Sequence, residues 1–71
     1  NPRLSIQRLA NLILSKMTPE DQHVVYEDLS MNQNNYGELA GMLDEYGIEP
    51  TDKRIRDFRS ALRSTLDQIF E

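Results

Sequence analysis

Apolar residues recur at helical spacing through the last twenty or so residues of the chain, and this pattern constrains the fold more than any other feature. Ile55, Phe58, Leu62, Leu66 and Ile69 are three or four residues apart, so they form one stripe on an α-helix. Such a stripe is the face by which a helix packs on a core. No segment alternates apolar and polar residues with a period of two. The sequence therefore predicts an all-α chain that ends in a helix over 51–70.

Start and stop signals divide the rest of the chain into three further helices. Thr18, followed by a proline and two acids, favours a helix start. Asn35 and Glu38 have the spacing of a capping box. Gly47 stands where a left-handed residue ends a helix. We predict a compact four-helix domain with helices over 5–16, 19–30, 36–46 and 51–70, and a solvated loop at the amide run 32–35.

Two expectations concern the edges of the apolar faces. On the first helix, Leu9, Leu12 and Ile13 fall on one stripe and Leu14 lies off it, so the apolar face is wide. On the last helix, Arg59 falls close to the apolar edge. We expect its stem to lie along the core and its guanidinium to pair with an acid or to reach a partner.

Length and charge limit the classes of protein. With 71 residues the chain is one small domain, and it contains no cysteine. The longest apolar run is three residues, so we expect no membrane span and a cytoplasmic location. Because the chain opens with Asn1 rather than Met, we expect a domain excised from a longer protein or a processed start. The net charge of −4 is uneven: residues 17–49 carry eight acids and no Lys or Arg, whereas 1–16 and 50–64 are each net basic.

The residue types that catalysis or metal binding requires are missing or scattered. His23 is the only histidine, and without cysteine no nitrogen and sulfur ligand set can assemble around a metal. Paired acids occur at a helix start and on an exposed helix face, whereas general-acid catalysis needs a partly dry cleft. We expect no catalytic residues, no metal, no cofactor and no enzymatic activity.

Three segments together resemble a known family. Thr18–Asp21, Asn35–Ala40 and the stretch from Ile55 to Leu62 resemble the C-terminal helix-turn-helix of bacterial sigma factors, over about residues 18–66. Gly47 follows Leu39 by eight residues, a longer spacing than in sigma factors. In this respect the chain is more similar to the helix-turn-helix of Mu-like phage small proteins and of serine-recombinase C-terminal regions. The resemblance is therefore to the helix-turn-helix superfamily.

This resemblance implies a duplex-DNA-binding domain in transcription regulation. The helix over 51–70 would be the recognition helix, and its N-terminal part would enter the major groove. Arg3, Arg8 and Lys16 could add contacts to the DNA backbone from the first helix. The residues that the resemblance places at bases or phosphates are Lys53, Arg54, Arg56, Asp57, Ser60 and Arg63.

The overall acidity leaves a second hypothesis open, in which the chain is an acidic helical protein–protein interaction module, either an adaptor or an oligomerisation domain. Its partner would be another protein or a second copy, bound through the first helix and the C-terminal helix. The residues that would carry this contact are Leu14, Glu20, Asp21, Glu27, Asp28, Leu66 and Phe70.

Overall fold

The computed structural model describes the backbone of residues 2–31 and 35–71, and the side chains of 6–31 and 35–71. Within these residues the chain forms four helices and no strand, which confirms the all-α four-helix prediction. The predicted helix ends differ from the observed ones by at most three residues. Asn1 and most of the amide run, 32–34, lie outside the described residues. The helices are α1 (Pro2–Ser15), α2 (Pro19–Met31), α3 (Tyr36–Glu45) and α4 (Asp52–Phe70).

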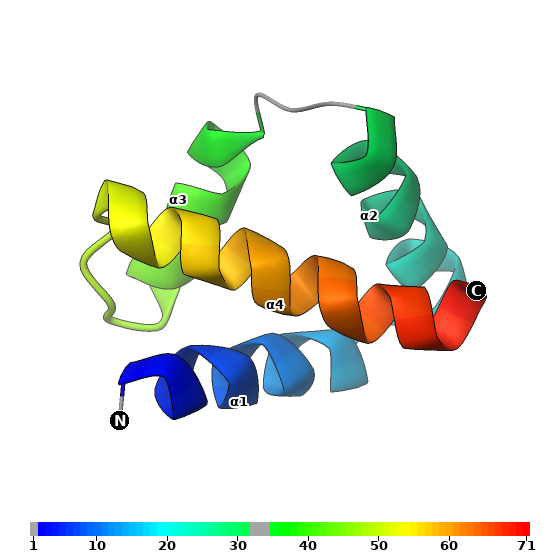
Figure 1. Cartoon of the computed structure of the whole chain (residues 1–71), viewed down its shortest axis with the longest axis horizontal. Helices are drawn as coiled ribbons and strands as arrows, with labels where there is room; N and C mark the ends of the chain where they lie inside the picture. Colours follow the sequence, from blue (N-terminus) through cyan, green and yellow to red (C-terminus); the bar gives the residue numbers. More distant parts are fainter. Residues whose placement is uncertain (1, 32–34) are drawn as a thin grey trace.

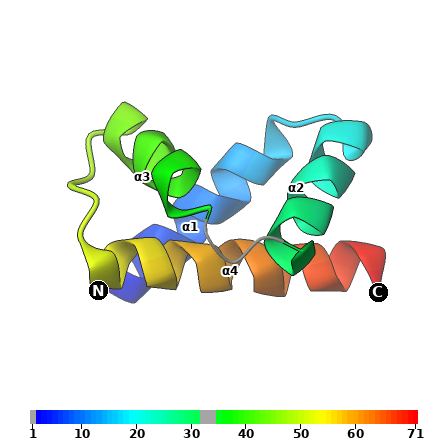
Figure 2. The ribbon, with the colours of Figure 1, turned by 90° about the horizontal axis from the view of Figure 1, so that it is seen from above.

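α4 is the helix on which the others assemble. It contacts α1, α2 and α3, which contact one another little. α1 runs alongside α4, while α3 packs near the N-terminal half of α4 and α2 near its C-terminal half (Figure 1). Seen at right angles, α4 extends along one edge of the molecule and α2 and α3 lie to the same side of it (Figure 2). One side of α4 is therefore covered by three helices, and its other side faces outward.

Local signals in the sequence set three of the helix ends as predicted. The backbone N–H of Asp21 donates to Thr18 Oγ1 at 3.1 Å, and that of Arg54 donates to Thr51 Oγ1 at 3.2 Å, so both threonines cap the helices that follow them. Gly47 has a φ of +77°, in the left-handed region. The N–H of the next residue then donates to the carbonyl of Leu43 at 2.9 Å, which ends α3 as expected.

The predicted capping box at the start of α3 is wrong. Asn35 precedes the helix with φ −90° and ψ 21°, outside the extended conformation of a capping residue, and its side chain makes no cap hydrogen bond. The side chain is instead 3% exposed, and neither amide atom has a hydrogen-bond partner in the described structure. Asn35 is buried where α2 and α3 face each other, a tertiary placement that the local pattern does not predict.

The core is formed by apolar side chains of all four helices. On α1 the sequence assigned two leucines incorrectly: Leu12, expected on the buried stripe, is 44% exposed, and Leu14, expected off it, is 2% exposed. Only three residues connect α1 to α2, and Gln22 donates to the carbonyl of Leu14 at 2.7 Å. The start of α2 therefore covers the end of α1, and the buried face of α1 is turned toward α2. The largest fully buried side chains are Leu29, Leu43, Phe58, Leu62 and Leu66.

The apolar stripe of α4 is buried along most of its length but not at its end. Ile55, Phe58, Leu62 and Leu66 are all buried, as the spacing predicts. Ile69, predicted in the same stripe, is 50% exposed, whereas Phe70 of the same last turn packs against the core. No helix within the described residues is both long enough and apolar enough to cross a membrane.

Candidate nucleic-acid interface

The outer face of α4 carries the exposed polar residues on the side opposite its apolar stripe. At 100° per residue these positions fall within one sector of the helix, about 180° from Phe58 and Leu62. No helix covers this sector, because the other three pack on the opposite side (Figures 1 and 2). The residues of the outer face are Lys53, Arg56, Ser60, Ser64 and Gln68, all of them exposed.

Three of the predicted DNA-binding residues come together in the first two turns of this face. Lys53, Arg56 and Ser60 are exposed and point outward. Within the described residues, neither Lys53 nor Arg56 forms an ion pair or a side-chain hydrogen bond. Two positive charges at the N-terminal end of α4 are therefore not used by the fold.

Two more of the predicted residues lie next to these in the sequence. Arg54 is exposed, and its Nη1 donates to the carbonyl of Glu49 at 3.1 Å in the α3–α4 connection. Asp57 falls within the angular sector of the outer face, is half-buried and has no ion pair within the described residues. Its negative charge lies one residue from Arg56 and reduces the positive potential there.

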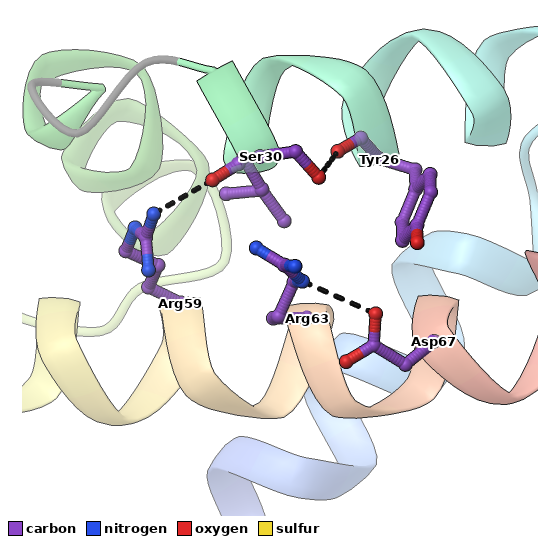
Figure 3. Close-up of polar contacts among 6 residues, drawn as sticks. Tyr26, Ser30, Arg59, Arg63 and Asp67 are labelled. Carbon is purple, nitrogen blue, oxygen red and sulfur yellow. Dashed lines mark hydrogen bonds and ion pairs between the residues drawn. The ribbon is translucent and has the colours of Figure 1, made fainter. Parts of the chain in front are cut away.

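Arg63, also predicted to bind DNA, is turned toward α2. Its Nε lies 3.1 Å from Asp67 Oδ1, and its guanidinium lies 5.7 Å from the centre of the Tyr26 ring. Figure 3 shows Arg63 between α4 and α2, beside Tyr26. Arg63 lies two turns after Arg56 on nearly the same side of α4, and there its guanidinium is engaged by Asp67 and Tyr26.

Arg59 joins the two helices in another way. Its Nη2 donates to the backbone carbonyl of Leu29 at 2.8 Å, in the last turn of α2 (Figure 3). The last four carbonyls of a helix have no partner within that helix, so Arg59 satisfies one of them. The sequence suggested an acid or an external partner for this guanidinium. Every residue has a backbone carbonyl, so the sequence does not mark one as the partner of Arg59. This partner, 30 residues away, could therefore not be predicted from the apolar pattern.

The residues proposed for a protein contact do not form one exposed surface. Leu14 and Leu66 are 2% and 0% exposed, so neither can touch a partner while the domain is folded, and we correct that prediction. Phe70 is half-buried against α2, with its ring centre 5.1 Å from that of His23 and 5.4 Å from that of Tyr26. Of the acids of α2, Glu20, Asp21 and Glu27 are exposed and Asp28 is half-buried.

Nothing in the described part of the chain gathers the side chains of a metal site: no three or more His, Asp or Glu residues come close enough to share an ion. His23 Nδ1 and Glu27 Oε1, which lie 3.2 Å apart, are on the surface of α2. No protein-family model, curated protein or solved structure matches the chain. The resemblance to helix-turn-helix proteins thus stays a prediction.

Proposed function

We propose that this chain is a small domain that binds duplex DNA through the N-terminal half of the outer face of α4. The observation that carries the proposal is that α4 extends along one edge of the molecule with the three other helices behind it. A helix placed in this way can enter a groove without a collision from its neighbours. Lys53, Arg56 and Ser60 are the side chains that would meet the DNA.

The dimensions of α4 suit the major groove. Its 19 residues correspond to a length of about 28 Å at about 1.5 Å per residue. The major groove of B-DNA is about 12 Å wide and accepts one α-helix. In helix-turn-helix proteins, the N-terminal residues of the recognition helix contact the base edges. Arg56 is the candidate for a bidentate contact to guanine, and Lys53 and Ser60 are candidates for phosphate contacts.

The distribution of charge supports the same orientation. Every Lys and Arg of α4 lies in its first twelve residues, and the acids of 17–49 belong to α2, α3 and their connections. α2 and α3 pack against the inner side of α4, so the basic outer face approaches DNA first. Arg8 and Lys16 of α1 are exposed and can add phosphate contacts. The N-terminal ends of α1 and α4 lie toward the same end of the molecule (Figure 1).

The proposal is tested by titrating the chain against a fluorescent DNA duplex at low salt and again at about 0.2 M salt. If Lys53 and Arg54 each neutralise one phosphate, the slope of log K against log salt is about −2, because each contact contributes about −0.9. Lys53→Ala should weaken binding and reduce this slope by about one, whereas Arg56→Ala should remove the proposed guanine contact and weaken binding by about 1–3 kcal/mol.

Arg63→Ala is the matched control, because it removes the same charge from the flank that faces α2. It should leave the affinity and the salt slope close to those of the unchanged chain. Absence of binding at low salt would rule the proposal out. An equal loss with Arg63→Ala and Arg56→Ala would show that net charge, rather than the outer face of α4, governs binding.

A second candidate is a protein-interaction domain. It is favoured by the exposed acids of α2, together with Val24 and Met31 on the same helix, which are 65% and 85% exposed. Exposed apolar residues beside a charged surface are typical of protein contacts. If the chain binds no DNA at low salt and an α2 variant such as Val24→Lys changes its association with other proteins, the second candidate is favoured.

A further inference from the structure

A groove between α2 and α3 is used by none of the preceding arguments. Its volume is about 190 Å³, and Val24 and Val25 line it from α2, and Leu39 and Met42 from α3. Val24 is 65% exposed. Since an apolar cavity of about 150 Å³ can bind benzene, this groove has room for one branched apolar side chain.

The groove is bordered by negative charge. Asp28 from α2 and Glu38 from α3 both line it, and neither forms an ion pair within the described residues. The segment 17–49, which contains both helices, has no Lys or Arg that could neutralise them. Opposite charges across an interface select partners and orient them. The groove therefore favours an apolar side chain that is accompanied by positive charges.

Asn35 gives the groove a second unusual feature. It lines the groove, and both atoms of its amide are buried without a hydrogen-bond partner in the described structure. Buried polar groups nearly always have a partner, and leaving one unpaired costs about 1–3 kcal/mol. Asn35 is therefore a polar position in the wall of an otherwise largely apolar groove.

α1 carries a surface that fits this description. Arg8, Leu12 and Lys16 are four residues apart, so they lie along one side of the helix, and all three are exposed. Leu12 is 44% exposed, with one positive charge a turn before it and another a turn after it. Lys16 Nζ lies 5.8 Å from the centre of the Tyr46 ring, still on the surface. Leu12 does not line the groove of its own molecule.

We propose that Leu12 of one molecule inserts into the α2–α3 groove of a second copy, with Arg8 and Lys16 beside Asp28 and Glu38. The two surfaces are different parts of the chain, so the contact is head-to-tail. Each molecule in such a pair keeps one free groove and one free Leu12, and association continues into a ring or an open chain. With a single apolar anchor, the contact belongs to the weak and transient class of interfaces.

Sedimentation equilibrium of the full chain without DNA, from micromolar to millimolar concentration, tests this proposal. The average mass should rise past that of a dimer and should fall again when salt is added. Leu12→Glu removes the anchor and Val24→Lys repels the incoming cations, so each variant alone should remain monomeric. Both positions are exposed, and circular dichroism should show unchanged helix content.

The mixture of these two variants gives the sharpest result. Leu12→Glu keeps an intact groove and Val24→Lys keeps an intact anchor, so together they should form a heterodimer that grows no further. Ile69→Glu, a control at another half-exposed apolar residue, should associate like the unchanged chain. Three outcomes would each overturn the proposal. The full chain could stay monomeric at millimolar concentration, or the mixture could form no heterodimer. Association could also be lost with Ile69→Glu but kept with Leu12→Glu.

Discussion

Arg56 and Arg59 lie three residues apart on α4, and the structure gives them opposite roles. Arg56 is exposed and has no partner within the described residues, whereas Arg59 is half-buried and bonds to the carbonyl of Leu29 at 2.8 Å. Replacing Arg59 should therefore destabilise the fold, and replacing Arg56 should not. For DNA binding we expect the opposite: replacing Arg56 should weaken it, and replacing Arg59 should not.

The size of the stability effect follows from the contact of Arg59. A hydrogen bond to a charged group contributes about 1.5–3 kcal/mol, and the partial exposure of Arg59 places its contact near the lower end of that range. For a domain of this length 1 kcal/mol corresponds to about 4–8 °C in Tm, so Arg59→Met should lower Tm by about 5–15 °C. Methionine keeps an apolar side chain of similar length, so the loss of stability measures the contribution of the guanidinium. Arg56→Ala should change stability by at most about 0.5 kcal/mol.

Thermal unfolding followed by circular dichroism measures the first effect, and urea unfolding gives the free energy independently. The DNA titration is then repeated at a temperature where both variants are folded. Arg59→Met should bind like the unchanged chain, and Arg56→Ala should bind more weakly. Equal stability of Arg59→Met and the unchanged chain would refute the role assigned to the contact with Leu29. A marked loss of stability with Arg56→Ala would show that this arginine belongs to the fold.

Five further replacements test the account of the fold by urea unfolding. Gly47→Ala should cost about 1–2 kcal/mol, because alanine is disfavoured at a φ of +77°. Thr51→Ala should cost about 1 kcal/mol, the usual effect of losing a helix cap, and Asn35→Ala should cost less because the Asn35 side chain makes no cap hydrogen bond. Leu14→Ala should cost about 2–5 kcal/mol, a large part of the stability of so small a domain, whereas Leu12→Ala should have little effect.

The parts of the fold that the sequence predicted correctly depend on neighbours within one turn or on a regular period. Thr18 caps α2 with its own hydroxyl, and Gly47 ends α3 through its own φ. The outward direction of Lys53, Arg56 and Ser60 follows from the 100° step of the helix and from the buried stripe opposite them. Their exposure was therefore predictable, while their binding to DNA stays a prediction.

The features of the fold that the sequence did not predict depend on how the helices pack against one another. α2 covers the end of α1, so Leu14 is buried and Leu12 is not. The last turn of α2 lies beside α4, and it determines which partner Arg59 finds. The groove between α2 and α3 joins residues of two helices that the local pattern treats separately. The sequence by itself determined the helix ends at Thr18, Gly47 and Thr51 and the apolar side of most of α4, because those properties are local. Only the tertiary structure decided which apolar edge is covered and which charged side chain is used by the fold, because both depend on contacts between residues far apart in the chain.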